Sequence, residues 1–490
     1  MRCRPALLVA GFALLLALGL ARHEMWRDEL QAWMLAGASP SPAALVANMS
    51  HEGHPALWQL LLLPLARAGA PVEAMQVVHF LVALVGVSLF VAWAPFPLAA
   101  RALFACSYLP LFEYGVISRD YALALPLLWT TCHLWERDRR PWLALGALLA
   151  LLANCNPYAW LLAGALLAAI GVESALAPGR RRDATSRPAE VAGGLLLALG
   201  GLAGALWQMV PPPDALYAHG PPLVSVPRAL RAAGTLASAY LPFPDWQTLT
   251  PWNSALVFRL APPLLATLAV LGIGAAFTLL PAPGPRALFA FGTAALLAFT
   301  YLRYIGWARH HGHHVLLFVA CCWLAARTPE ATDRWRRTRH GALAALLAVH
   351  LATAAWLYGA DLMRPFSTAK AAAATLASPS LAALPAVGYP DPVLPAVGGY
   401  RGAPLLSLVT GRPLSFVVWQ ADDEPRRGGF EVCVRLAARL RTTGSFAFVA
   451  PLDALASPCP LLTAEPIGPA PPPPLVPSER LAVWRITASP

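Results

Sequence analysis

Long runs of apolar residues recur along most of this chain. They lie at about 5–22, 55–68, 74–94, 97–112, 120–135, 141–153, 158–176, 189–210, 256–280, 287–304, 313–326 and 341–359. Hydrophobic residues fill 58% of the 490 positions and charged residues only 12%, and the mean hydropathy is +0.56. Because about 20 apolar residues in a helix span a bilayer core, the pattern predicts an all-α polytopic membrane protein and excludes a soluble one.

Positive charge marks one side of the predicted membrane protein. Arginine gathers in short loops at 136–141, 178–188, 281–286 and 327–340. Cytoplasmic loops carry such an excess, so these loops and the N-terminus are expected in the cytoplasm, in a plasma (inner) membrane protein. The loops account for most of the formal net charge of +11, so nucleic acid is not an expected partner. No small-residue cleavage pattern follows the first apolar run, which is therefore expected to be a retained span.

One apolar segment must fail to cross the membrane. The charge count places Arg119 outside the cytoplasm, on the same side as Asp28. The chain must therefore cross the membrane an even number of times between residues 55 and 118, but three apolar segments lie there. The segment at 97–112 is short and has Pro97 and Pro110 near its ends. It is expected to form a half-span or re-entrant helix that other helices shield. About eleven transmembrane helices remain, and the C-terminus then lies outside.

The character of the sequence changes after residue 360. Residues 361–490 alternate short apolar runs with Gly, Pro and charge, a pattern typical of strands and turns, with a helix expected at Glu431–Arg441. We therefore predict a transmembrane domain over 1–360 and a small extracytoplasmic α/β domain over 361–490. Cys433 and Cys459 can form a disulfide if this second domain lies outside the cytoplasm.

Two loops are expected on the outer face. In the first, 23–54, apolar residues recur at helical spacing, and Ser41 followed by proline predicts the start of a second helix over Pro42–Met49. Two short amphipathic helices of this kind lie flat at a membrane surface. The second loop, 211–253, is rich in proline and aromatic residues and has a predicted amphipathic helix at Pro227–Tyr240.

Asp28 and Glu29 stand in the first of the two flat helices. Side chains at adjacent helical positions diverge by about 100°, so only one carboxylate can face a reacting centre while the other orients the helix or a partner. The functional interpretation is a general base or a metal ligand at an outer-leaflet site. The alternative is a solvated pair that marks the membrane surface.

Further polar groups stand just before apolar runs on the same predicted face. They are Glu52, His54, Arg119, Asp120 and Tyr121. Glu52 and His54 suit the capping of a helix that begins at a proline, and a helix N-terminus also attracts phosphate. Arg119 and Asp120 form either a neutralised ion pair or a second part of a site.

A late run, RHHGHH, begins at Arg309 and includes His310 and His311. Adjacent histidines diverge, and the run lacks a clear three-ligand spacing for a metal ion. An arginine flanked by imidazoles suits a phosphate or pyrophosphate better. Ordinary loop polarity is the alternative.

These motifs, in this order, resemble those of the integral-membrane glycosyltransferases of the GT-C superfamily. The matching stretches are WRDEL after the first run, HEGHPALWQLL, SRDYALALPLL and RHHGHH. The resemblance is to the bacterial branch of protein mannosyltransferases and aminoarabinose transferases, and it covers roughly Arg2–Tyr358. It implies a GT-C-like catalytic domain that takes a sugar from a polyprenyl-phosphate carrier and transfers it to a protein, lipid or glycan on the outer face.

The resemblance also implies roles for single residues. Asp28 would be the base that activates the acceptor hydroxyl, and Glu29 would support it. Residues assigned to substrate binding are Glu52, His54, Arg119, Asp120, Tyr121, Arg309, His310 and His311. The RDY stretch departs from the simplest R-x-Y pattern, and two further histidines follow the RH-x-G core, which leaves the donor sugar and a divalent metal ion open.

A polyprenyl phosphate is a good leaving group, so one base and phosphate stabilisation would suffice for transfer. A single displacement predicts inversion at the anomeric carbon. Two other functions also fit carboxylates and cations on the outer face: a transporter or flippase of lipid-linked sugars, and a non-enzymatic envelope assembly protein. No paired broken helices in two matching halves, the usual sign of alternating access, are evident in the sequence.

Overall fold

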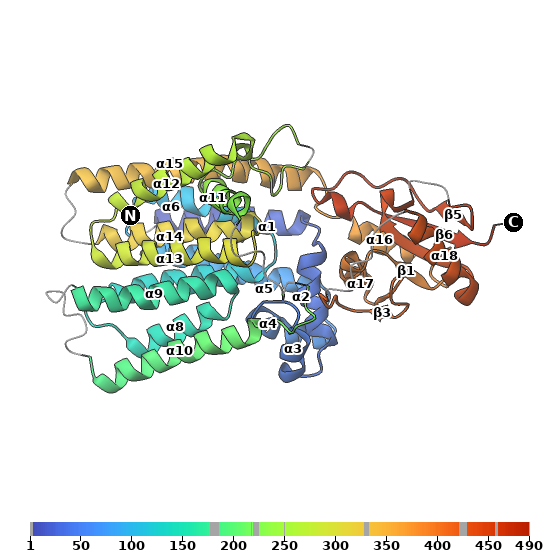
Figure 1. Cartoon of the computed structure of the whole chain (residues 1–490), viewed down its shortest axis with the longest axis horizontal. Coiled ribbons are helices and arrows are strands. Elements are labelled where there is room, and N and C mark those ends of the chain that lie inside the picture. The colour runs from blue at the N-terminus through green and yellow to red at the C-terminus, as the bar shows by residue number, and fades with distance from the viewer. Residues whose placement is uncertain are drawn as a thin grey trace.

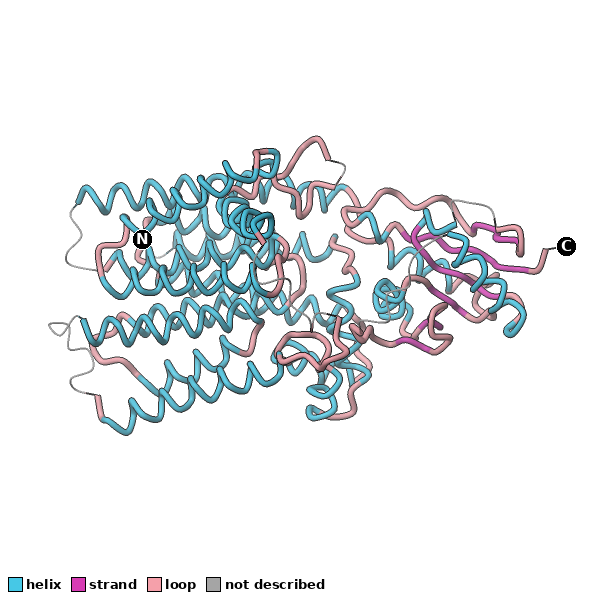
Figure 2. Tube along the Cα trace, viewed as in Figure 1, coloured by secondary structure: helices cyan, strands magenta, loops and turns pink. Residues whose placement is uncertain are grey.

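A helical bundle and a small sheet make up the protein (Figure 1). The computed structural model describes residues 3–176, 186–216, 218, 225–248, 250–327, 333–420, 429–455 and 459–489. Most of the cytoplasmic loop expected at 178–188, part of that at 327–340 and part of the outer loop at 211–253 lie outside these residues. Figure 2 shows that the strands all lie at the C-terminal end of the molecule, beyond one end of the bundle.

Six helices among the described residues are long and apolar enough to cross a membrane. They are α1 (Cys3–Arg22), α5 (Glu73–Trp93), α9 (Pro157–Leu176), α10 (Pro188–Met209), α13 (Pro283–Leu302) and α15 (Asp333–Met363). The rest of the bundle includes α7 (Ala124–Trp135), α8 (Trp142–Ala153), α12 (Pro262–Thr278) and α14 (Ala308–Ala326). The protein therefore has the composition and helices of a multi-pass membrane protein, and the number of eleven crossings stays a prediction.

The apolar segment at 55–68 does not run the length of the bundle. Its helix α4 (Leu57–Arg67) has 11 residues, or about 16 Å, against a bilayer core of about 30 Å. The next helix, α5, begins beside the end of α1: the Gln76 side-chain amide in its first turn donates to the Leu20 carbonyl at 3.0 Å. Both ends of α4 thus lie at the same end of the bundle.

The segment at 97–112 connects the two ends of the bundle, whereas a half-span was predicted. It consists of α6 (Leu98–Ala105) and a π-helix, η1 (Tyr108–Glu113). Phe96, before it, contacts His340 near the start of α15, whereas the Tyr114 hydroxyl, after it, donates to the Arg309 carbonyl at the start of α14. The prediction of a re-entrant half-span here is wrong: two short helices in series connect the two ends, and η1 is entirely buried, which shields its irregular backbone.

The last part of the chain forms a mixed six-stranded sheet in the order β3-β2-β1-β4-β6-β5. The strands are β1 (Ala386–Gly388), β2 (Leu405–Ser407), β3 (Pro413–Leu414), β4 (Phe446–Pro451), β5 (Thr463–Pro466) and β6 (Leu481–Thr487). Helices α16 (Ala369–Leu376), α17 (Leu394–Arg401) and α18 (Gly429–Thr443) accompany them. The first strand pairs in parallel with β2 and β4, and the other pairings are antiparallel. The expected helix in this region is present as α18.

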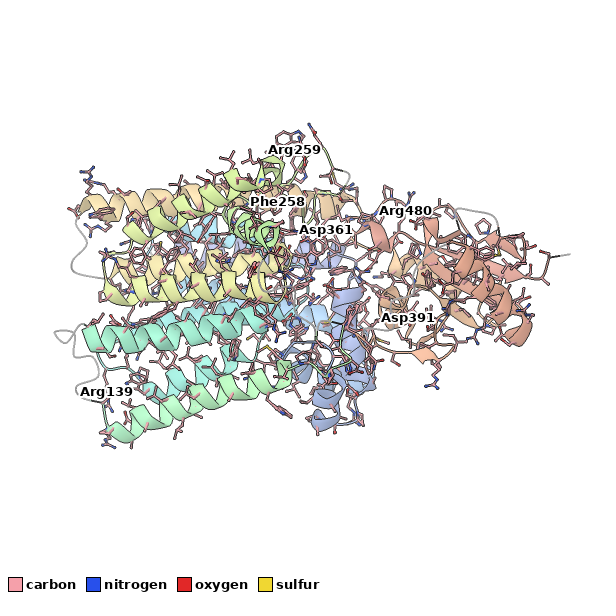
Figure 3. All side chains as sticks on the ribbon, in the orientation of Figure 1. Arg139, Phe258, Arg259, Asp361, Asp391 and Arg480 are labelled. Atoms are coloured by element: carbon pink, nitrogen blue, oxygen red, sulfur yellow. A yellow bond between two sulfur atoms is a disulfide. The ribbon has the colours of Figure 1, made fainter. Side chains whose placement is uncertain are left out.

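A layer of short helices lies between the bundle and the sheet. It contains α2 (Arg27–Ala38), α3 (Pro42–Asn48) and α4, and α2 runs crosswise to the long helices (Figure 1). The Ser41 hydroxyl accepts from the Ala44 amide at 3.2 Å, so the predicted cap is present. In the second loop, the predicted amphipathic helix is α11 (Val226–Tyr240). Figure 3 places Asp361 at the junction with the sheet and Arg139 at the far end of the bundle.

A disulfide joins Cys433 of α18 to Cys459, and such bonds persist in oxidising compartments. We therefore expect a membrane-impermeant maleimide to label Cys433 and Cys459 in intact cells only after reduction. The matched control is Arg139→Cys at the other end of the bundle, which should be labelled only after the cells are opened. Labelling of the Arg139→Cys variant in intact cells would place the layer of short helices, at the other end of the bundle, in the cytoplasm.

Candidate active site

Asp28 lies between two arginines that come from distant parts of the sequence. Its Oδ2 atom is 2.9 Å from Arg119 Nη1 and 3.0 Å from Arg309 Nη2. Asp28 is in the first turn of α2, Arg119 immediately precedes the 3-10 helix η2 (Asp120–Leu123), and Arg309 is in the first turn of α14. Three predicted site residues are therefore in direct contact.

The charge around Asp28 favours its ionised form. Burial works to raise the pKa of Asp28, but Arg119, Arg309 and Arg27 outweigh it and hold this pKa below its usual value. The side chain is still 21% exposed, so a polar group can reach it. Asp28 is a carboxylate at neutral pH, and two guanidinium groups are in direct contact with it.

Glu29 points away from Asp28, as expected for adjacent helical positions. It is fully buried, and its Oε1 accepts from the Ser118 amide at 2.6 Å while its Oε2 accepts from the Trp26 amide at 3.1 Å. It also forms an ion pair with His23 at 2.9 Å. Glu29 thus fastens the start of α2 to the segment that carries Arg119.

His23 is a residue of this network that sequence reasoning missed. Its Nε2 faces Glu29 and its Nδ1 faces Asp361 of α15, each at 2.9 Å. Burial would lower the pKa of His23, but Asp361 and Glu29 raise it to about 10. An imidazolium between two carboxylates therefore joins α1, α2 and α15.

We expect His23→Gln to destabilise the protein by about 3–5 kcal/mol, because two buried carboxylates lose their cationic partner. The raised pKa adds stability that is complete below pH 6.5 and is lost as the pH rises through about 10. Thermal unfolding in detergent between pH 6.5 and 10 should show a fall for the wild type that is smaller in the variant. Equal slopes would mean that His23 is neutral in the folded protein.

Asp120, His54 and Tyr121 lie close to Arg119, the residue just before η2. Asp120 Oδ1 is 3.6 Å from Arg119 Nε, and Asp120 Oδ2 is 3.6 Å from His54 Nδ1. The Arg119 guanidinium lies over the Tyr121 ring at 5.7 Å. The structure therefore brings a second carboxylate to the arginine that contacts Asp28, and an imidazole to that second carboxylate.

Glu52 is held next to this group by a residue that the sequence did not single out. Gln31 donates to Glu52 Oε1 at 2.8 Å. The same amide makes two hydrogen bonds to the Val417 backbone, at 2.8 and 3.0 Å. Burial raises the pKa of Glu52, although Gln31 and His54 act to lower it.

The two predicted site histidines of the RHHGHH run, His310 and His311, have different surroundings. The His310 ring stacks on Tyr158 at 4.9 Å and is edge-on to Tyr121 at 5.7 Å, and its Nδ1 accepts from the Trp307 amide. His311 instead bonds the Ile305 carbonyl at 2.8 Å. Within the described ranges, no three His, Cys, Asp or Glu side chains converge as metal ligands.

The π-helix contributes a buried acid behind the arginines. Glu113 Oε2 accepts from the Tyr108 hydroxyl at 2.5 Å and from Trp252 Nε1 at 2.9 Å. Trp252 lies edge-on to Trp26 at 5.0 Å, and the Arg309 guanidinium lies over the Trp26 ring at 5.7 Å. Glu113 is thus linked to Arg309 through the rings of Trp252 and Trp26, in a π-helix, a type of helix that occurs frequently at functional sites.

Comparison with known proteins identifies the fold. No protein-family profile matches the sequence, and no curated protein matches it. The structure is similar to that of the aminoarabinose transferase ArnT from Cupriavidus metallidurans bound to undecaprenyl phosphate, with a TM-score of 0.55 and 12% identity, over 98% of this chain and 97% of that one. The apo structure of the same protein gives a TM-score of 0.53 with the same identity and coverage. The chain has the ArnT fold, as the sequence motifs predicted.

Proposed function

We propose that this protein is a membrane glycosyltransferase that moves a sugar from a polyprenyl-phosphate carrier to an acceptor outside the cytoplasm. The observation that carries the proposal is the contact of Asp28 with Arg119 and Arg309. It supplies one candidate base and two cations, each with a nitrogen within about 3 Å of the Asp28 carboxylate. The ArnT structure that shares the fold binds undecaprenyl phosphate, a ligand whose charge such cations would match.

Binding of the donor phosphate would change the pKa of Asp28, the candidate base. In the free protein, Arg119 and Arg309 lower the pKa of Asp28, which makes it a weak proton acceptor. A phosphate that binds the two guanidinium groups would draw them from the carboxylate and add negative charge beside it. The pKa of Asp28 would then rise, so donor binding would activate the base.

The transfer would be a single displacement. The acceptor hydroxyl oxygen attacks the anomeric carbon, and the bond from that carbon to the phosphate oxygen breaks. The hydroxyl proton passes to Asp28, and the polyprenyl phosphate leaves as an anion paired with Arg119 and Arg309. One displacement inverts the anomeric configuration, so a product with retained configuration would contradict this mechanism.

Binding of undecaprenyl phosphate to the purified protein tests the donor site. We expect Arg309→Ala to weaken binding by at least about tenfold, since one charge-assisted contact is lost. Asp28→Asn should bind at least as tightly as the wild type, because the carboxylate that competes for the arginines is gone.

The matched control is Arg259→Ala, whose partner is Asp245 at an exposed position at the same end of the bundle. Its affinity should equal that of the wild type in native mass spectrometry. Equal losses in Arg259→Ala and Arg309→Ala would mean that the lipid is held by general surface charge, and would contradict a phosphate site at Asp28.

A further inference from the structure

Glu479 reaches the first turn of α2 from the far end of the sequence. It ends the short 3-10 helix η6 (Pro477–Glu479) and is fully buried. Its Oε1 accepts from the Arg27 amide at 3.1 Å and is 3.7 Å from Arg27 Nε. Arg27 immediately precedes Asp28, so a residue of the C-terminal region contacts the turn that carries the candidate base.

The backbone that carries Glu479 is fixed on both sides. The Thr368 amide and hydroxyl donate to the Glu479 carbonyl at 3.1 and 2.8 Å, and the Leu481 amide donates to the same hydroxyl at 2.7 Å. Just before η6, the Val476 amide donates to the Phe366 carbonyl at 3.0 Å. Glu479 is therefore presented by a rigid segment.

Two glutamate side chains, one from α2 itself and one from the C-terminal region, accept from the amides at the start of α2. The residue before the helix is Trp26, whose indole is a donor only and cannot cap a helix. Glu29 accepts from the Trp26 amide, and Glu479 accepts from the Arg27 amide. The N-terminal position also suits a carboxylate, because the helix dipole is positive there.

Burial of the charged Glu479 carboxylate lowers the stability of the folded protein. Burial raises its pKa to about 7, although Arg27 and Ser367 act to lower it. Among the residues that the structure describes, its second oxygen, Oε2, has no hydrogen-bond partner. A glutamine would cap the same amide without a buried charge, so it is the charge of Glu479, and not the cap, that costs stability.

We propose that Glu479 is a positioning residue that caps α2 and thereby fixes Asp28 between Arg119 and Arg309, which makes the C-terminal region a component of the active site. This inference rests on the proposed transferase function. It assigns the segment that presents Glu479, from Val476 to Leu481, a role in catalysis besides any contact of the C-terminal region with the acceptor.

Amide hydrogen exchange of the full-length protein in detergent tests the cap directly. Glu479→Ala should speed exchange at the Arg27 amide by about tenfold, since loss of a cap costs about 1 kcal/mol or more, and leave peptides of α9 and α13 unchanged. Glu479→Gln should exchange like the wild type, because its amide oxygen still accepts. Wild-type exchange in Glu479→Ala would overturn the cap.

Product formation in cells separates positioning from folding. Glu479→Ala should lower the sugar-bearing product at least about tenfold, as expected when a reacting group is misplaced, and Glu479→Gln should restore most of it. The control Glu465→Gln, in an exposed pair with Arg485, should match the wild type. A parallel loss of product and of folded protein in both Glu479 variants would overturn positioning and leave a structural role.

Stability against pH tests whether the buried carboxylate of Glu479 costs stability. The charged groups that face Glu479 are Arg27 and Asp28 of α2. Because the pKa of Glu479 is raised, stability is lost as the pH rises from 4.5 through about 7. Glu479→Gln should therefore unfold at the same or a higher temperature than the wild type at pH 8, and a lower temperature would contradict the account of a costly carboxylate.

Asp28→Asn in the same cells distinguishes the two proposals. If this variant keeps the product, the proposed function fails whatever Glu479 does, and the exchange experiment still decides the cap. If Asp28→Asn loses the product while Glu479→Ala keeps both product and slow exchange, only the positioning role of Glu479 fails.

Discussion

Asp28→Asn is expected to lower sugar transfer by about a thousandfold. A general base contributes about 10²–10⁴ to a rate, and asparagine cannot take the proton of the acceptor hydroxyl. The fold should be kept, because the helix start is fastened by Glu29 and Glu479 rather than by Asp28. The measurement is the amount of the sugar-bearing species per unit of protein in the membrane.

The matched control for this variant is Asp245→Asn, since Asp245 pairs with Arg259 at an exposed position. It removes one carboxylate from the same end of the bundle without touching the arginines of the site. Product at the wild-type level in both variants would show that Asp28 is not the base. The transport and assembly functions would then gain support, because neither requires this carboxylate.

Arg309→Ala is expected to lower transfer by about 10²–10³, because a cation that stabilises the leaving phosphate is lost. Arg309→Lys should restore little, since a lysine cannot place two donors on Asp28 and phosphate at once. The loss of one cation should also raise the pKa of Asp28. The acid limb of the pH–rate profile should therefore move to higher pH, and the variant should lose activity earlier as the pH falls.

The control is Arg303→Ala, at the end of α13 and outside the ion pairs of the site. Arg309→Ala with an unchanged acid limb would mean that the group titrating in the profile is not Asp28. A full restoration by Arg309→Lys would mean that a point charge suffices and that the paired geometry is irrelevant.

Local sequence signals predicted the parts of the site that depend on neighbouring residues. Ser41 and its following proline predicted the start of α3, and the 100° rule predicted that Asp28 and Glu29 would face different partners. Charge counting placed Arg119 on the same face as Asp28, and the family resemblance assigned Arg309 to the same site, but the direct contacts of Asp28 with both arginines were not predicted. Charge counting can assign a face without knowledge of packing, which is why the shared face of Asp28 and Arg119 could be anticipated.

Contacts between distant segments were not predictable in this way. His23 and Asp361 are 338 positions apart, and Arg27 and Glu479 are 452 apart, so no spacing rule connects them. The prediction that 97–112 is the apolar segment that does not cross the membrane was also wrong. An even number of crossings required that one of the three apolar segments between residues 55 and 118 does not cross the membrane. Hydropathy alone did not show that this segment is 55–68, because it did not reveal that α6 and η1 follow one another across the bundle.

The most direct test of the central claim follows both sides of the reaction in one pair of strains. Polyprenyl phosphates and envelope glycans would be compared by mass spectrometry in cells that carry the wild-type protein or Asp28→Asn. We predict that the variant accumulates one sugar-loaded polyprenyl phosphate and lacks one sugar-bearing acceptor. Identical donor and acceptor pools, with the variant present in the membrane at the wild-type level, would contradict a transferase that uses Asp28.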